Sequence, residues 1–268
     1  MRLAQYNRCL WGVIRREALR WVHQRGRFIS ALVRPLVWLV IFAAGFRTAL
    51  GEAIIPPYET PIPYEVYIVP GLVAMVQLFN GMLSALAIVY DREMGSMRLL
   101  MISPFPRWFL LNAKLLAGVA VSIVQVYMFL AIAWFWDIRP PPVGYLCVLP
   151  ALAVVGLMLG AFGLVLSSFV RQLENFAGVM NFVIFPMFFA SSALAPLARV
   201  KEASLAVYWI SALNPFTHAT ELIRFALYGR LSALSLAAVA AYTALFWAVA
   251  IQAYDPGRGL AVRRPVAE

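Results

Sequence analysis

The sequence predicts an all-α integral membrane protein with six transmembrane helices. Hydrophobic residues make up 63% of its 268 residues, against about 45–50% in a soluble domain, and the mean hydropathy is +0.81. Charged residues make up only 13% of the chain and gather between long apolar runs. Several of these runs reach the roughly 20 residues that a helix needs to cross the hydrocarbon core of a bilayer.

Composition also limits the partners. The net charge of +10 could indicate a nucleic-acid-binding protein, but the basic residues cluster at the ends of apolar runs, so lipid rather than nucleic acid is the expected partner. Cys9 and Cys147 lie far apart and lack metal-ligand spacing, which favours two ordinary thiols over a disulfide.

The first 34 residues carry eight arginines. On a helical wheel the apolar residues share one arc and most arginines lie opposite, a pattern typical of a helix in the membrane interface. Glu17 falls on the apolar arc, and a disordered basic tail is the alternative. The apolar arc consists of Leu3, Tyr6, Leu10, Val13, Ile14, Ala18 and Trp21.

Six apolar runs are candidate spans. The first begins close to Arg34-Pro35, and Pro186 is expected to kink the fifth. The expected ranges are 30–50, 66–89, 108–134, 145–170, 175–197 and 233–254.

The distribution of basic residues predicts the orientation. With six spans, both termini share a side, and that side carries sixteen of the 22 basic residues. Cytoplasmic loops hold the excess of Lys and Arg, so both termini are expected in the cytoplasm.

The charged segment 90–107 separates the second span from the third. Asp91 suits an N-cap, Glu93 suits a first helical turn, and Pro104 stops a helix. We therefore expect a short cytoplasmic helix there. Docking to another protein and resting on lipid headgroups are its two alternative roles.

The segment 198–232 before the last span is too long for a plain turn. It predicts a helix that lies in the outer interface or re-enters the membrane, which is tolerated only where protein buries it. The signals are a cap, a first-position proline, a pair of opposite charges three residues apart and an exit glycine: Asn214, Pro215, Glu221, Arg224 and Gly229.

Motifs for chemistry are absent from the sequence. It contains no G-x-x-x-x-G-K-[ST], H-E-x-x-H or G-x-S-x-G, so neither ATP hydrolysis nor a metal site is expected in this chain. The two histidines, His23 and His218, are expected on opposite sides of the membrane.

The middle of the spans holds neutral polar residues rather than carboxylates. Ion-driven carriers usually keep an ionisable group at mid-membrane, so this pattern weakens a secondary transporter. The neutral residues either join helices by hydrogen bonds or line a substrate path. They are Gln77, Asn80, Gln125 and Asn181.

Two motifs resemble those of ATP-binding-cassette (ABC) permeases of the type-2 exporter class. One is the R-E-x-G-[ST] core that leads through leucines to Ser103-Pro104, and the other is the N-P-[LF]-T motif that continues from Asn214 to Gly229. The segment D-R-E-M-G-S-M-R-L-L is also similar to the corresponding segment in permeases of bacterial quinoprotein alcohol-oxidation systems. The family's coupling residues would correspond here to Asp91, Arg92, Glu93, Gly95, Ser96 and Arg98.

The resemblance implies a membrane subunit that exports a substrate from the bacterial inner membrane. Two permeases would pair as a homodimer, and separate ATPase subunits would bind ATP and Mg²⁺ and dock on the coupling helix. The connecting helix would occupy residues 1–29, the transmembrane domain 30–257 and a cytoplasmic tail 258–268. Asn214, Pro215, Glu221 and Arg224 would belong to an external gate helix. A stand-alone carrier or channel and a membrane anchor without transport are the alternatives.

Overall fold

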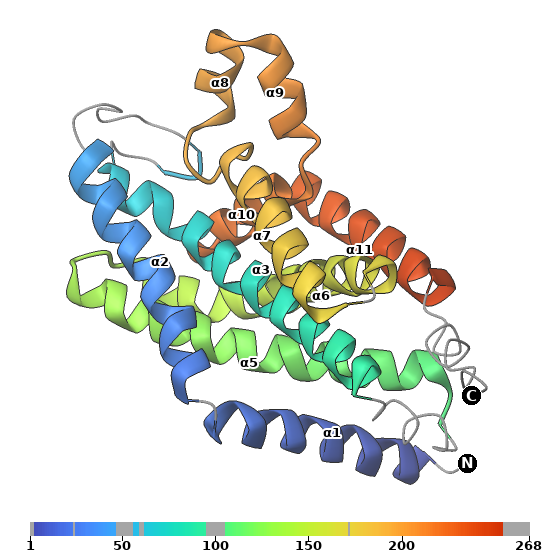
Figure 1. The fold of residues 1–268 in the computed structure, drawn as a ribbon. Helices are drawn as coiled ribbons and strands as arrows, with labels where there is room; N and C mark the ends of the chain where they lie inside the picture. The colour runs from blue at the N-terminus through green and yellow to red at the C-terminus, as the bar shows by residue number, and fades with distance from the viewer. Residues whose placement is uncertain are drawn as a thin grey trace, which may run out of the picture.

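The computed structural model describes residues 3–23, 25–46, 56–58, 62–94, 105–170 and 172–253, and helices dominate them. Figure 1 shows α1 crossing one end of the bundle and α8 and α9 projecting from the opposite end. We refer to these as the α1 end and the α8 end. The helices are α1 (Leu3–His23), α2 (Arg25–Phe46), α3 (Tyr64–Glu93), α5 (Arg107–Phe135), α6 (Pro142–Phe169), α7 (Leu173–Phe189), α8 (Leu197–Ala203), α9 (Leu205–Ala212), α10 (Pro215–Leu227) and α11 (Ala233–Ala253).

Helix α3 forms the centre of the fold. It packs against α2, α5, α6, α7 and α10, and 72% of its most apolar window is buried, against 17% for α11. Helix α11 packs mainly on α6 at the edge of the bundle. The different burial of α3 and α11 follows from their positions, since a helix at the edge of the bundle keeps an apolar surface for lipid.

Glycines allow α3 and α6 to approach closely. A Cβ added at Gly163 would lie 2.8 Å from the carbonyl oxygen of Gly81, and one added at Gly81 would lie 2.9 Å from that of Leu159. The backbones are therefore in direct contact, as small residues permit between membrane helices.

Four of the six predicted spans are confirmed as helices long and apolar enough to cross a bilayer: Tyr64–Asp91, Trp108–Phe135, Pro142–Phe169 and Ala233–Ala253. At the predicted first and fifth spans, the described apolar helices are the shorter Leu32–Ile41 and Leu173–Phe189. Six crossings therefore stay a prediction.

Helix α7 ends at Phe189, eight residues before the predicted limit at position 197. The Ser191 hydroxyl donates to the carbonyl oxygen of Phe188 at 2.6 Å and so offers the backbone an alternative to another helical turn. Pro196 prevents the helix from resuming until α8. With 17 residues, α7 is about 26 Å long, shorter than the hydrocarbon core of about 30 Å.

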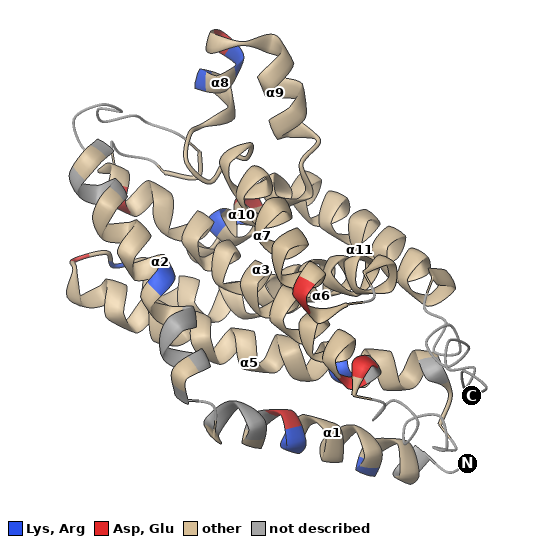
Figure 2. Cartoon of the chain, viewed as in Figure 1, with Lys and Arg blue, Asp and Glu red and all other residues tan. Residues whose placement is uncertain are grey.

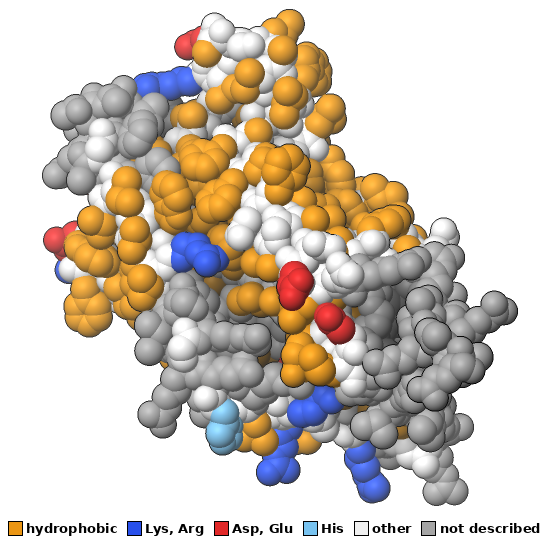
Figure 3. Space-filling model, in the orientation of Figure 1, with side chains coloured by type: hydrophobic (Ala, Val, Ile, Leu, Met, Phe, Trp, Pro, Cys, Tyr) orange, Lys and Arg blue, Asp and Glu red, His pale blue; other side chains and the backbone are white. Residues whose placement is uncertain are grey.

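Most charged residues lie apart from the apolar surface. Figure 2 shows charged residues along α1, on α8, close to helix ends and part-way along α2, while α11 carries none along its length. Figure 3 shows hydrophobic side chains over much of the face that includes α2 and α7. On α7 the exposed aromatic residues are Phe182, Phe185 and Phe189.

Candidate functional site

The α1 end of α3 is fixed to α5 by an ion pair. Lys114 Nζ lies 2.5 Å from Asp91 Oδ2, and the two side chains are only 12% and 11% exposed. The prediction that Asp91 caps a new helix is wrong, because α3 continues through Asp91 to Glu93. Lys114, 23 residues further along the chain, supplies the opposite charge that makes a carboxylate in this position tolerable.

Glu93 links the same end of α3 to the start of α7. Its Oε2 accepts a hydrogen bond of 3.1 Å from the backbone N–H of Leu173, the first residue of α7. Gln172, the N-cap residue, provides no side-chain cap itself. A carboxylate from another helix thus meets the positive end of the α7 dipole.

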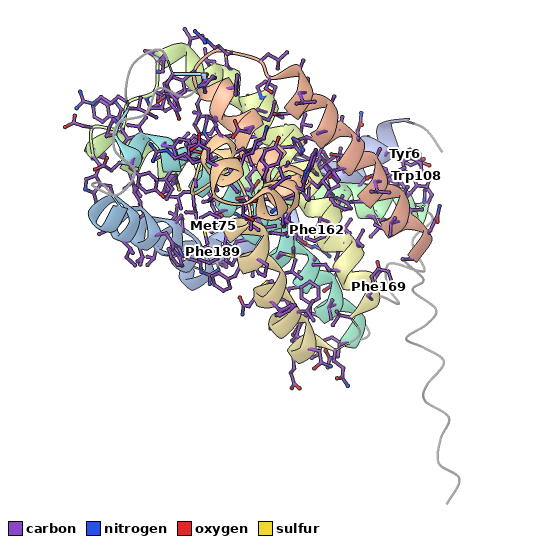
Figure 4. All side chains as sticks on the ribbon, turned by 90° about the horizontal axis from the view of Figure 1, so that it is seen from above. Tyr6, Met75, Trp108, Phe162, Phe169 and Phe189 are labelled. Carbon is purple, nitrogen blue, oxygen red and sulfur yellow. The ribbon has the colours of Figure 1, made fainter. Side chains whose placement is uncertain are left out.

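Beyond Glu93 the chain enters the predicted coupling segment and returns at Phe105. On the return side, the ring of Tyr6 on α1 makes edge contacts with Phe105 at 5.3 Å and Phe109 at 4.8 Å between centroids. Figure 4 shows Tyr6 next to Trp108 at the start of α5. The described chain on both sides of the segment is therefore fixed to neighbouring helices.

The remaining residues predicted for coupling are less fully placed. Arg92 belongs to the last turn of α3. Three others lie outside the described residues, as does the rest of the short predicted helix: Gly95, Ser96 and Arg98. Their role in coupling stays a prediction.

Three of the predicted mid-span polar residues lie inside the bundle. The amide nitrogen of Asn80 donates to Gln125 Oε1, which joins α3 to α5. Both polar atoms of the Gln77 side chain are buried and lack a hydrogen-bond partner within the described ranges. Gln77 borders a cavity of about 10 Å³ lined by serines and glycines, a volume that holds about one water molecule. The hydrogen-bonding alternative is confirmed for Asn80 and Gln125.

Asn181 differs from these three residues. It lies on α7, is exposed, and neighbours Phe182, whose side chain is 80% exposed. A polar amide on an otherwise apolar membrane helix is costly when it faces lipid, so this surface suits a protein partner or an aqueous path.

At the α8 end, Arg224 of α10 is buried, with only 1% of its side chain exposed. It forms an ion pair with Glu221 and donates from Nη2 to the carbonyl oxygen of Ser192 at 3.0 Å. Its guanidinium carbon lies 4.1 Å from the ring centroid of Tyr67 on α3. Arg224 therefore joins α10 to α3 and to the turn after α7. The predicted pairing of Glu221 with Arg224 is confirmed.

Burial keeps the nearby tyrosine neutral. Desolvation raises the pKa of Tyr58 to about 12, although Arg224 acts in the opposite direction. Tyr58 therefore carries no charge near neutral pH, and Glu221 is the carboxylate that balances Arg224. Burial also lowers the pKa of His218 on α10.

Asn214 connects α10 to the end of α7. Its Oδ1 accepts from the N–H of Phe216 at 2.9 Å, which confirms the predicted cap, and Pro215 occupies the first helical position. Its Nδ2 donates to the carbonyl oxygens of Met187 at 2.8 Å and Ala190 at 2.6 Å. These carbonyls belong to the last turn of α7, so one side chain caps two helices at once.

The sequence pointed to both of these regions without identifying the contacts. Glu93 was expected to face a partner protein, yet it bonds to a residue 80 positions away. Tyr6, Lys114 and Tyr67 were not predicted as site residues, because only the tertiary fold brings them there. In the described part of the chain, no group of three or more His, Cys, Asp or Glu residues could hold a metal ion.

Comparison with known proteins bears on both regions. Residues 8–228 match the ABC-2 type transporter family. A Cyanophora paradoxa protein named as a transport permease, ycf38, is 28% identical over 204 residues, which cover 74% of this chain and 66% of the relative. An Escherichia coli K12 protein named as a multidrug ABC transporter permease, YbhR, is 28% identical over 169 residues, or 62% of this chain and 45% of the relative.

Another relative is nodulation protein J of Rhizobium leguminosarum, which is 22% identical over 230 residues, or 81% of this chain and 82% of its own length. By contrast, the matched part of the chain spans less than two thirds of the length of ycf38 and of YbhR. The family match itself covers most of the chain and includes the α1 end of α3, the polar residues of the bundle and all of α10. The chain therefore belongs to the ABC-2 type transporter family.

Proposed function

We propose that this chain is the permease subunit of an ATP-driven exporter in a bacterial inner membrane, with six spans and both termini in the cytoplasm. A separate ATPase subunit would bind ATP and Mg²⁺ and dock at the α1 end, on the segment between α3 and α5. Family membership supports this proposal. The observation that carries it is the anchoring of both sides of that segment, by Asp91 and Glu93 before it and by Tyr6 after it.

This anchoring suits the transmission of force. The end of α3 that leads into this segment is held by Glu93 to α7 and by Asp91 to α5, so its displacement would load both helices. Packed and hydrogen-bonded elements of this kind carry energetic coupling between distant sites. In this proposal Glu93 is a positioning residue that carries displacement of the docking segment to α7.

The exposed face of α7 supports pairing of two permeases. Asn181, Phe182 and Phe185 lie on one side of the helix without cover from the described residues. A second copy packed there, or a path between two copies, would remove Asn181 from lipid. YbhR is named as a multidrug ABC transporter permease, and we extend drugs as a class of substrate to this chain. The quinoprotein context stays a prediction.

The test separates docking from coupling. The tagged chain is purified gently with its partners, and ATP-dependent transport is measured in proteoliposomes containing the co-purified ATPase. Gly95→Trp should lose the ATPase, because it changes the docking segment. Glu93→Ala should retain the ATPase but lower transport by about fivefold or more, and Glu93→Gln should restore it, because an amide oxygen still accepts from Leu173.

Glu174→Ala is the matched control, since Glu174 is an exposed carboxylate in the first turn of α7. It should leave transport unchanged. If no nucleotide-binding protein accompanies the wild-type chain and transport follows an ion gradient, the exporter proposal fails and the stand-alone carrier replaces it. Loss of the ATPase from Glu93→Ala would instead make Glu93 a docking residue.

A further inference from the structure

Helix α2 places an exposed arginine against the middle of α3. The guanidinium carbon of Arg34 lies 3.9 Å from the ring centroid of Phe79 on α3. Phe79 is fifteen residues from Tyr64 and twelve from Asp91, the two ends of the span, or about 22 and 18 Å along the helix axis. The positive charge of Arg34 therefore lies close to the middle of the membrane-spanning part of α3.

Arg34 has no balancing charge within the described ranges. It takes part there in no ion pair and no hydrogen bond, and its side chain is exposed. Contact with an aromatic ring stabilises a cation by only about 0.5–2 kcal/mol, which is less than the cost of holding an arginine at the bilayer centre. Ionisable residues inside a membrane are rare and mark substrate or ion pathways.

A second copy of this chain does not supply the missing anion from its four spans or from α7. In the four spans and in α7, the carboxylates lie within two residues of a helix end: Glu65, Asp91, Glu93 and Glu174. None of them reaches the depth of Phe79. An anion from another molecule would balance this charge.

Further aromatic side chains lie one helical turn from Arg34. Trp38, one turn further along α2, lies 6.5 Å from Phe188 and 6.0 Å from Phe189 of α7 between ring centroids. Helix α2 thus contacts α7 one turn from Arg34, and both helices pack on α3 (Figure 1). An exposed cation beside such apolar surface matches a molecule with an acidic headgroup and an apolar tail.

We propose that Arg34 binds the anionic headgroup, a carboxylate or a phosphate, of an acidic amphiphile. The guanidinium forms paired hydrogen bonds to such groups, which a lysine ammonium does not. As a statement about transport, this inference rests on the proposed exporter function and narrows its substrates to acidic amphiphiles. The binding step itself needs no ATPase.

The experiment measures binding by the full chain, purified with its partners and placed in phosphatidylcholine nanodiscs. Energy transfer from tryptophan to dansyl-undecanoic acid is titrated at about pH 8, where the carboxylate is ionised, and protein-free nanodiscs are subtracted. The methyl ester of the same compound is the neutral probe. The wild type should bind the acid about tenfold more tightly than the ester, as one charged hydrogen-bonded contact provides.

The variants assign that preference to one side chain. Arg34→Gln should bind acid and ester equally, with its affinity for the ester unchanged, which also shows that the site still folds. Arg34→Lys should keep part of the preference. Arg199→Gln, at an exposed arginine on α8, is the matched control and should behave as the wild type.

Two results overturn the proposal: equal binding of acid and ester by the wild type, or an unchanged acid preference in Arg34→Gln. Addition of phosphatidylglycerol to the nanodiscs distinguishes the source of the anion. If the acid preference persists, the occupant is a free amphiphile. If the anionic lipid removes it in the wild type, Arg34 holds a bilayer lipid, and the substrate part of the proposal is wrong.

Discussion

Replacement of Arg224 by methionine tests whether its buried guanidinium holds α10 against α3 and the turn after α7. Methionine keeps much of the side-chain volume but removes the positive charge and all donors. The change deletes the ion pair to Glu221, the bond to the carbonyl oxygen of Ser192 and the contact with the ring of Tyr67. Three elements, α10, α3 and the turn after α7, lose their common contact.

The cost follows from these contacts. A hydrogen bond from a charged group contributes about 1.5–3 kcal/mol, and a buried cation over an aromatic ring about 2 kcal/mol. Breaking a buried ion pair by removing one partner costs about 3–5 kcal/mol. Glu221 is 21% exposed, so water offsets part of the penalty on that side. We expect a loss of about 4 kcal/mol, or roughly 10 °C in the melting midpoint.

The assay is thermal unfolding in one detergent, followed by tryptophan fluorescence. Arg224→Lys should fall between the wild type and Arg224→Met, because an ammonium keeps the charge but not the planar stacking. The double variant Glu221→Gln with Arg224→Met should lose less than the two single changes together, by about 1–2 kcal/mol, since no unpaired carboxylate remains. Arg199→Met should leave the midpoint unchanged.

A midpoint for Arg224→Met within about 2 °C of the wild type, or about 1 kcal/mol, would refute the reasoning. Strict additivity in the double variant would refute the ion pair alone, while leaving the contacts with Ser192 and Tyr67 in place.

Three further predictions concern other contacts. Lys114→Met should lower the free energy of unfolding by about 3 kcal/mol or more, because the carboxylate of Asp91 stays buried without that cation, and Asp91→Asn in the same chain should recover part of the loss. Gly163→Val should cost about 1–3 kcal/mol, because its Cβ would lie 2.8 Å from a backbone oxygen of α3, whereas Gly178→Ala, with nothing within 4 Å, should not. Burial lowers the pKa of His218, so the folded state binds fewer protons than the unfolded state, and stability should fall as the pH drops through about 6.5. His218→Gln should reduce that fall between about pH 7.5 and 5.5.

Local patterns predicted much of the fold. Hydropathy over windows of span length located four helices to within a few residues, since the bilayer acts on each segment directly. Three predicted features of α10 depend only on neighbours within that helix, and all three are confirmed. They are the cap by Asn214, Pro215 at the first helical position and the ion pair of Glu221 with Arg224. The positive φ of Gly229, at 67°, agrees with its predicted position at the helix exit.

The errors and omissions depend on contacts between distant residues. Asp91 has the residue type of an N-cap, yet its pairing with Lys114 lets α3 continue past it. The polarity of Asn80 and Gln125 was visible in the sequence, but their pairing across 45 residues was not. Arg34 was assigned to the edge of the first span, because one helix alone does not reveal that Phe79 meets it near the middle of another.

The double cap by Asn214 has a consequence for biosynthesis. The carbonyl oxygens of Met187 and Ala190 receive their donor from a residue that the ribosome adds more than twenty positions later. Until then, the end of α7 must stay near water or translocon, because an unpaired carbonyl is costly in lipid. Helices α3 and α5 can associate earlier, through Asn80 and Gln125. The end of α7 should therefore reach its final structure only after position 214 has been synthesised.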